Sequence, residues 1–353
     1  MIWLRHIMEH DDKKRHKGHA FMKDLIKRLV ETVGPSGYEG AVRDLIRGEI
    51  EAMADEIRVD AMGNLIARKG AKGEGGLRIM ISGHMDEIGV IATHIDEKGF
   101  VRFTGIGGVY PRHCIGGRVR FLNGAQGVIY MDRMDDNNKM PALSDMYIDL
   151  GAADRASCPV KVGDLGVFDR PFADLGSRLV SKAMDDRIAC AVMIEAMRQI
   201  DSSPNELYFV FSTQEEVGLR GATTAAYGVD PDLGLAVDVT GSGDTPKTMF
   251  RMEVGLGKGP AVKVRDGGML ADPRVMRWMV ETAEKANIPY QMEVLEGGTT
   301  DARAIQMTRA GVPSGCLSIP TRYIHSPSEM VDYDDVQNSV KLLAALLSGP
   351  VSI

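Results

Sequence analysis

Short uninterrupted apolar runs alternate along most of the chain with segments in which apolar residues recur every three or four positions. The runs lie at residues 77–82, 206–212, 233–237 and 314–320. A continuous apolar run of this length is typical of a strand covered on both faces, whereas the intervening segments have the periodicity of helices. The order of these segments predicts an α/β fold, in which helices flank both faces of a mostly parallel or mixed sheet.

Residues 89–176 break this pattern. They are rich in Gly and Val, form short alternating runs, and show weak helical periodicity. Asn123 and Gly124 lie between two strand-like runs, which is a strong hairpin signal. We therefore predict a small β-domain, residues 89–176, inserted into a larger domain formed by residues 20–88 and 177–353.

The first 19 residues are charged and contain four histidines, at positions 6, 10, 16 and 19. These histidines could bind a metal ion, but a flexible, solvated tail is the interpretation we prefer. The apolar run in this segment is too short for a signal peptide, and no stretch of the sequence approaches the length of a membrane span.

The overall charge and the cysteines narrow the class of partner. The net charge of −7 leaves no basic excess to neutralise phosphates, which argues against nucleic-acid and anionic-membrane partners. The four cysteines are scattered, with no CxxC pair. This usage is typical of a reduced chain, and we expect a cytoplasmic location.

Polar side chains follow each of the four apolar runs. Because open α/β sheets bind ligands at the carboxyl ends of their strands, we expect these side chains to meet. They are His84 and Asp86 after the first run, Glu215 and Glu216 after the second, Asp238 after the third and His325 after the fourth, with Asp185 and Asp186 at the start of a helix. Taken singly, such a histidine is more often structural, a Glu pair is usually solvated, and an Asp pair can simply cap a helix. The recurrence of carboxylates and imidazoles at independent strand ends predicts a metal site.

The charges of five of these residues favour two divalent ions. Asp185, Glu216 and Asp238 supply three negative charges, while His84 and His325 coordinate as neutral imidazoles. Two divalent cations leave a charge of plus one, which a bound hydroxide brings to neutral, and a bridging carboxylate can hold such a pair together. A single ion would leave excess carboxylate charge in a poorly solvated pocket. Imidazole and carboxylate ligands suit zinc, with cobalt or manganese as alternatives.

Two further residues are predicted to assist the chemistry. Glu215 precedes a predicted ligand, and we expect it to accept a proton from a metal-activated water and pass it to a leaving amine. Asp86 lies two residues from His84, and we expect it to accept the free N–H of that ring. The set predicts hydrolysis by a metal-bound hydroxide with a glutamate as general base.

With these residues assembled, the sequence resembles the TET-type dinuclear metalloaminopeptidases, metallopeptidase family forty-two, also called glutamyl aminopeptidases and, historically, cellulases. The matching segments span almost the whole chain in the expected order: GPSGYEG, DAMGNLIA, SGHMDEIG, MDDR, STQEEVGLRGA, DVTGSGDTP, GGTTDA and TRYIHSPSEM. The resemblance implies that His84 and Asp238 hold one metal, that Glu216 and His325 hold the other, and that Asp185 bridges them. The tail up to about residue 19 has no counterpart in the family.

The resemblance also implies an activity and an assembly. The family has an α/β metallopeptidase domain with an inserted, barrel-like (PDZ-like) β-domain used in dimerisation, and it removes N-terminal residues from short peptides. Homodimers are expected to build a homododecamer, with two divalent ions in each subunit. The segments GGTTDA and TRYIH imply a substrate pocket that includes Gly298, Thr299, Asp301 and Arg322. Arg322 could favour an acidic substrate or form a structural ion pair.

Three other functions compete with the aminopeptidase. A deacylase or carboxypeptidase would use the same two ions on a different substrate. A glycan hydrolase needs two carboxylates free of metal, whereas the best-placed carboxylates here are assigned as ligands. A non-enzymatic, self-assembling scaffold with a metal pair has no need of an uncommitted base such as Glu215. The two-metal aminopeptidase is therefore the function we predict.

Overall fold

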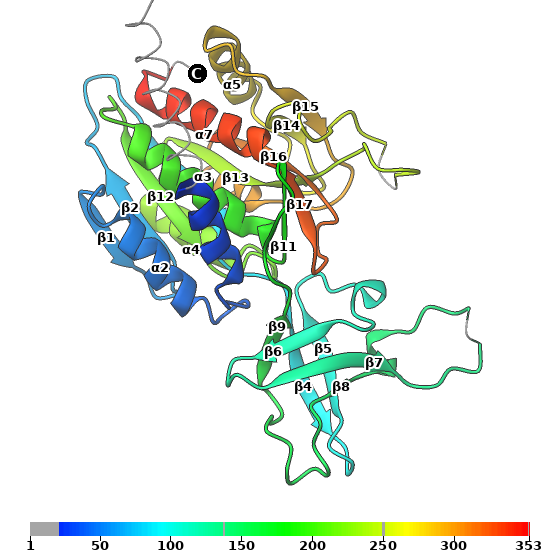
Figure 1. Ribbon diagram of the computed structural model, residues 1–353. Helices are drawn as coiled ribbons and strands as arrows, with labels where there is room; N and C mark the ends of the chain where they lie inside the picture. Colours follow the sequence, from blue (N-terminus) through cyan, green and yellow to red (C-terminus); the bar gives the residue numbers. More distant parts are fainter. Residues whose placement is uncertain (1–20, 137, 249–250, 352) are drawn as a thin grey trace, which may run out of the picture.

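The computed structural model describes residues 21–136, 138–248, 251–351 and 353. Figure 1 shows a large α/β domain and a small barrel that projects from it. The predicted fold class is confirmed, because helices flank a mixed sheet and a separate β structure is inserted in the chain. The predicted N-terminal tail, residues 1–19, lies outside the described residues.

The described residues of the large domain form an eleven-stranded mixed sheet. The four strands predicted from the apolar runs lie side by side at its centre and are parallel to one another. Across the sheet the order is β1 (Glu56–Val59), β2 (Leu65–Lys69), β12 (Glu206–Ser212), β3 (Arg78–His84), β13 (Leu233–Gly241), β16 (Ser314–Arg322), β17 (Glu329–Asp332), β11 (Arg178–Ser181) and β10 (Ala173–Asp174), with β14 (Ala261–Arg265) and β15 (Gln291–Val294) extending from β16.

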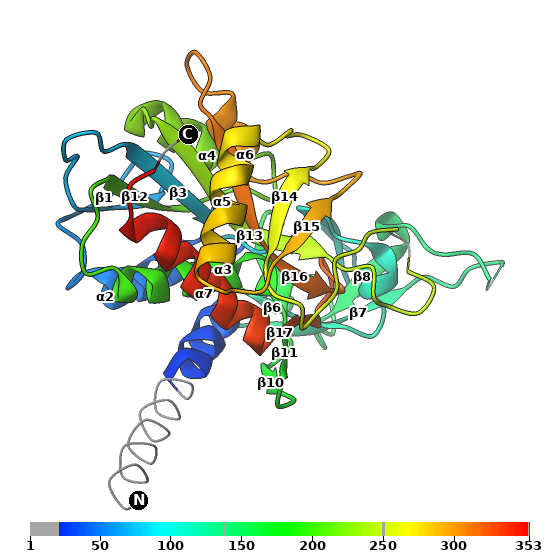
Figure 2. The same cartoon turned by 90° about the horizontal axis from the view of Figure 1, so that it is seen from above.

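Helices cover both faces of this sheet (Figures 1 and 2). Along β3, Ile79 and Ile81 pack into the main core, whereas Met80 packs into a second core on the opposite face. The burial of both faces explains why this strand is an uninterrupted apolar run. The helices are residues 21–31, α2 (Gly40–Ile50), α3 (Met184–Gln199), α4 (Arg220–Val229), α5 (Pro273–Lys285), α6 (Asp301–Gln306) and α7 (Tyr333–Ser348). No helix among the described residues is long and apolar enough to cross a membrane.

The small domain is a closed barrel with its own apolar core. Asn123 and Gly124 lie in the turn between two of its strands, where Gly124 adopts a φ of +89° that favours glycine. The strands, in their order around the barrel, are β4 (Gly89–Ile95), β5 (Val101–Ile106), β8 (Met146–Asp149), β7 (Gln126–Met131), β6 (Arg118–Phe121) and β9 (Leu165–Phe168), joined in part by the short 3₁₀ helices η1 (Pro111–His113) and η2 (Leu143–Asp145). Within the range proposed for the insert, β10 pairs with β11 of the large sheet instead.

The structure differs from the sequence prediction in a few elements. The sequence pattern predicts one helical segment over residues 177–200, but residues 178–181 form β11, because Leu179 is buried in the main core and pairs with Val331 of β17. Asp185 and Asp186, at the start of α3, have non-helical backbone angles. The sequence pattern does not predict α4, which is rich in Gly and Thr, or the short strands β14 and β17.

Candidate metal centre

The central strands bring the predicted site residues to one edge of the sheet. His84 is the last residue of β3 and pairs with Ser212, the last residue of β12, so the loop that follows β12 begins beside it. Asp238 lies within β13, opposite Ser318 of β16. His325 follows β16 and is therefore close to the same edge.

Asp185 lies between the two histidines. Its Oδ1 atom is 2.9 Å from Nε2 of His84, and its Oδ2 atom is 3.4 Å from Nε2 of His325. The same ring nitrogen of His325 is 3.2 Å from Oε2 of Glu216. One carboxylate that presents a different oxygen to each of two imidazoles has the arrangement required of a ligand shared by two cations.

The donor atoms fit divalent cations. Ligand atoms of His84, Asp185 and Glu216 lie within 4.8 Å of one another, and so do those of His84, Asp186 and Asp238. Oε1 of Glu216 and Oδ1 of Asp186 are buried and have no hydrogen-bond partner in the described structure. A buried carboxylate oxygen is costly without a partner, and a cation would supply one. Asp186 also accepts a hydrogen bond from the backbone N–H of His84.

The pKa values show how strongly these charges act on one another. Burial opposes protonation of His84, but hydrogen bonds to Asp185 and Asp86 outweigh it and hold the pKa of this histidine well above its usual range. Burial also opposes protonation of His325, yet the charge of Glu216 and the hydrogen bond to Asp185 raise its pKa to about 12. In the absence of cations the centre therefore holds protons, which divalent ions would displace.

Asp86 contacts other residues of the site in addition to His84, its predicted partner. Nδ1 of His84 is 3.4 Å from a carboxylate oxygen of Asp86 and 3.1 Å from its backbone oxygen. The same carboxylate accepts hydrogen bonds from the backbone N–H groups of Glu215 and Glu216 and from the hydroxyl of Ser36. Asp86 therefore ties the end of β3 to the loop that carries two other site residues.

Glu215 lies inside the cluster. Its Oε2 atom is 3.9 Å from Nε2 of His84, and its side chain is largely buried. Burial, reinforced by the charges of Asp238 and Glu216, raises the pKa of Glu215 well above its ordinary value. Gln214, directly before it, has a φ of +55°, so the chain turns sharply here and does not continue extended from β12.

A known family matches most of the chain: the sequence model described as M42 glutamyl aminopeptidase covers residues 63–342. The chain belongs to the M42 glutamyl aminopeptidase family. It is 48% identical over 324 residues to a putative aminopeptidase of Acetivibrio thermocellus, covering 91% of this chain and 97% of that protein. It is 38% identical over 341 residues to the lysyl aminopeptidase of Pyrococcus furiosus, with coverage of 92% and 96%.

Solved structures agree with this assignment. Aminopeptidase APDkam598 from the archaeon Desulfurococcus kamchatkensis is similar with a TM-score of 0.89 at 40% identity, covering 94% of this chain and 95% of that one. The TET1 peptidase of Pyrococcus horikoshii, which can assemble into a tetrahedron or a large octahedral shell, has a TM-score of 0.82 at 33% identity, with coverage of 92% and 99%. The chain is thus an aminopeptidase, a hydrolase acting on peptide bonds, and its grouped ligands indicate the use of divalent metal.

A cavity of about 790 Å³ opens over the predicted ligands of this aminopeptidase. Of the residues predicted to shape the substrate pocket, Gly298, Thr299 and Arg322 line it. The guanidinium of Arg322 donates to both carboxylate oxygens of Asp244, at 2.9 and 2.8 Å. Of the two alternatives that the sequence left open for Arg322, the structure contains the ion pair.

Asp301 has a different environment. It is 2% exposed and does not line the cavity. Its Oδ2 atom accepts hydrogen bonds from the hydroxyls of Ser82 and Ser212, at 2.6 and 2.5 Å. Ser82 lies two residues before the end of β3 and Ser212 is the last residue of β12, so Asp301 supports the strands that carry His84 and the loop before Glu215.

The sequence pattern did not identify two residues that support the predicted ligands. Glu329, on β17, accepts hydrogen bonds from the backbone N–H groups of Asp185 and His325, at 3.0 and 2.8 Å. Arg187 is fully buried and donates to the backbone oxygens of Met85, Leu29, Thr32 and Gly34. The available signal for Arg187 was the apolar run at residues 188–194 that directly follows it, because an arginine buried beside such a run needs several partners.

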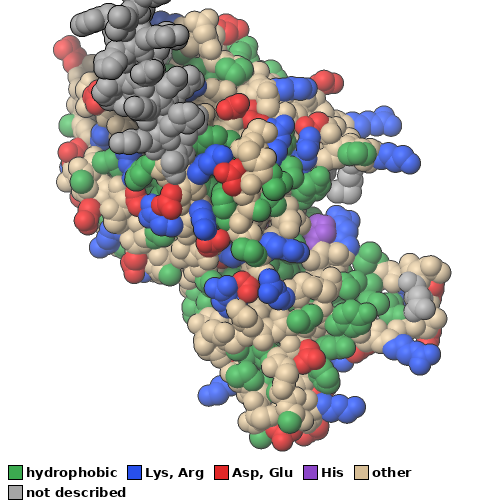
Figure 3. All heavy atoms as spheres, viewed as in Figure 1, with side chains coloured by type: hydrophobic (Ala, Val, Ile, Leu, Met, Phe, Trp, Pro, Cys, Tyr) green, Lys and Arg blue, Asp and Glu red, His purple; other side chains and the backbone are tan. Residues whose placement is uncertain are grey.

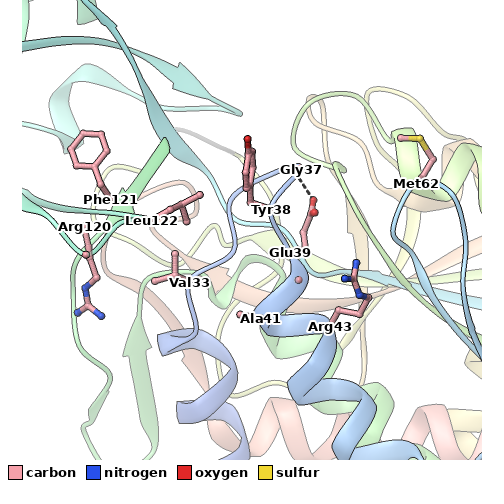
Figure 4. A pocket seen from close by; sticks show the side chains of 12 residues that line it. Val33, Gly37, Tyr38, Glu39, Ala41, Arg43, Met62, Arg120, Phe121 and Leu122 are labelled. Carbon is pink, nitrogen blue, oxygen red and sulfur yellow. Dashed lines mark hydrogen bonds between the residues drawn. The ribbon is translucent and has the colours of Figure 1, made fainter. Parts of the chain in front are cut away.

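A second cavity, of about 570 Å³, lies where the loop before α2 meets the barrel (Figure 4). Tyr38 and Leu122 face it from the two domains, and Glu39 beside it accepts a hydrogen bond from the backbone N–H of Gly37. None of the described residues that line this cavity is a predicted site residue.

Proposed function

We propose that the chain is a two-metal aminopeptidase that removes N-terminal residues from short peptides. One observation carries the proposal: the two oxygens of Asp185 face Nε2 of His84 and Nε2 of His325, at 2.9 and 3.4 Å. A single cation needs no such shared carboxylate, whereas a pair of cations does.

The ligands are proposed to divide between the two ions. His84 and Asp238 would hold one, Glu216 and His325 would hold the other, and Asp185 would contact both. When bound, the ions would polarise the scissile carbonyl and lower the pKa of the attacking water. The donor set suits zinc, with cobalt or manganese as alternatives.

Glu215 is proposed as the general base and acid. It takes a proton from the attacking water and delivers that proton to the nitrogen of the departing peptide. Its position 3.9 Å from the ring of His84 supports this role. The raised pKa of Glu215, caused first by burial, also supports it, because a higher pKa makes the carboxylate a stronger base toward the attacking water and lets it hold that proton until the amine leaves.

The substrate is proposed to bind in the 790 Å³ cavity, with its first side chain near Gly298 and Thr299. Arg322 is given no preference for acidic substrates, because Asp244 already pairs with it. The relatives do not indicate which N-terminal residue of the substrate is preferred, since one is a lysyl aminopeptidase and the family is described as glutamyl aminopeptidases. Asp301 is proposed as a support for the strand ends and not as a substrate ligand.

Assembly is proposed by similarity to the TET1 peptidase. The barrel, within residues 89–176, would mediate a homodimer, and dimers would build a homododecamer. That relative can form a tetrahedron or a larger octahedral shell, so particle mass is the quantity to measure. The four cysteines are free, which supports the reduced, cytoplasmic location expected from the sequence.

The function is tested with metal-depleted protein reconstituted with zinc, cobalt or manganese. We expect it to cleave a short peptide with a free amino terminus and to leave the N-acetylated twin intact. Cleavage of only the acetylated peptide would instead identify a deacylase. Glu215→Gln should still bind two ions but lose hydrolysis, and near-normal turnover in this variant would refute the role of Glu215.

A further inference from the structure

The inserted barrel reaches the predicted metal ligands through the segment between β5 and β6. Gly107 and Gly108 begin this segment, and a Cβ atom built on each would lie 3.0 Å from Oε2 of Glu216 and 2.2 Å from Nδ1 of His325, respectively. Both glycines therefore allow the barrel backbone to approach two predicted ligands of the large domain more closely than a residue with a side chain could. The surface narrows at this junction of the two domains, where Figure 3 shows an exposed histidine.

His113, in η1 of the same segment, contacts the backbone of a predicted ligand. Its Nδ1 atom is 3.0 Å from the backbone oxygen of His325. A carbonyl oxygen can only accept, so Nδ1 carries the hydrogen. Nε2 of His113 lies 3.2 Å from Nε of Arg112, which can only donate. The two contacts select the same tautomer of His113, the one that donates to His325.

The backbone of His325 needs this kind of support. Its φ is +59°, in the left-handed region that residues other than glycine rarely adopt. Glu329 of the large domain accepts from the N–H of His325 at 2.8 Å, and His113 of the barrel donates to its carbonyl. The two neighbouring peptide groups of His325 are thereby held from two domains, in the orientation that aims its ring at Asp185 and Glu216.

We propose that His113 is a positioning residue for His325, so that the barrel completes the metal centre as well as serving in assembly. The proposal rests on the ligand assignment of the proposed function. It concerns the ion assigned to Glu216 and His325, because the barrel segment contacts these two ligands. The ion assigned to His84 and Asp238 should depend less on His113.

The test compares three substitutions of His113. His113→Asn keeps an N–H donor near the position of Nδ1. His113→Phe keeps the ring volume but loses the donor, and His113→Ala loses both the ring and the donor. His94→Ala is the control, because His94 is an exposed histidine of the same barrel. Zinc is titrated by calorimetry into each metal-depleted, full-length protein, and thermal unfolding is recorded in parallel.

We expect wild type and His94→Ala to bind two zinc ions alike. His113→Phe and His113→Ala should each lower the affinity for one of the two zinc ions by about 10-fold or more, the range seen when a residue that orients a metal ligand is removed. His113→Asn should restore most of that affinity. In reconstituted protein, kcat should fall in the Phe and Ala variants while KM for the peptide stays near the wild-type value.

Two results would overturn the proposal. The first is an unchanged affinity for both zinc ions in His113→Phe and His113→Ala. The second is a loss of zinc affinity in His113→Asn that is as large as the loss in His113→Phe. If His113→Ala unfolds, the zinc affinities of His113→Phe and His113→Asn still test the proposal. The zinc affinities of the wild type and the variants could follow the expected pattern while the wild type cleaves no peptide. That result would contradict the proposed function and leave the positioning role supported.

Discussion

Oδ1 of Asp86 accepts a hydrogen bond of 3.0 Å from the backbone N–H of Glu215. The bond links the residue behind the imidazole of His84 to the residue proposed as general base, across 129 positions of sequence. Oδ2 of Asp86 accepts from the next N–H, that of Glu216, at 3.2 Å. One buried carboxylate therefore sets the positions of the proposed ligand His84, the proposed base Glu215 and the proposed ligand Glu216 together.

Asp86→Asn should lower kcat. An amide has only one acceptor oxygen, so one of the two N–H groups of Glu215 and Glu216 would face an N–H instead of an oxygen. We expect activity to fall by about 10- to 100-fold, the usual cost of disturbing a residue that orients a metal ligand. Steady-state kinetics on a free-amine peptide measures this. Asp24→Asn, at a side chain that is 62% exposed, is the matched control and should leave kcat unchanged, and full activity in Asp86→Asn would contradict the assignment.

Glu329→Gln should weaken metal binding. Glu329 accepts from the backbone N–H groups of Asp185 and His325 through different oxygens, and glutamine keeps an acceptor for only one of them. Affinity for divalent metal, measured by competition with a chelating dye, should fall by about 10-fold. The metal affinity of Glu329→Ala should fall further, because this substitution removes both acceptor oxygens. Equal affinity in wild type and both variants would show that these contacts do not position the ligands.

Arg187→Met should destabilise the protein. The substitution leaves several buried backbone oxygens without a donor, those of Met85, Leu29, Thr32 and Gly34, and it removes a charge 3.5 Å from the buried Glu87. The free energy of unfolding should drop by about 3 kcal/mol or more. Urea unfolding of the metal-depleted protein measures this without the contribution of bound ions.

The matched control for Arg187 is Arg277→Met. Arg277 is exposed on α5, and its replacement should change the free energy of unfolding by less than about 0.5 kcal/mol. Similar unfolding midpoints for the two variants would mean that the contacts of Arg187 contribute little.

Metal affinity should rise with pH. In the metal-depleted protein the pKa of His84 is well above its usual range and that of His325 is about 12, so both rings hold a proton at neutral pH. Only the deprotonated ring binds a cation, so each ion displaces protons, and removing those protons becomes easier as pH increases. Calorimetry of zinc binding in two buffers with different ionisation enthalpies counts the protons released. Binding without proton release, and with equal affinity at pH 6 and pH 8, would contradict this expectation.

The sequence by itself determined the α/β architecture and the candidate ligands. Strands buried on both faces must be apolar throughout, so 77–82 and 206–212 could be recognised without tertiary information. Parallel strands end at a common edge of their sheet, so polar residues after such runs, such as His84 and Glu216, could be expected to gather there. Residues 178–181 were harder to assign, because four residues beside a helix carry too little periodicity to mark a strand.

Only the tertiary structure decided how each side chain is aimed and supported. Thr299 and Asp301 are two residues apart, yet Thr299 lines the cavity and Asp301 lies buried against Ser82 and Ser212, because α6 begins at Asp301. The hydrogen bond from His113 to His325 joins residues 212 positions apart in different domains. No local pattern encodes such a contact, since it depends on how the barrel packs against the sheet, and hydrogen bonds act only between groups that the complete fold brings within about 3 Å.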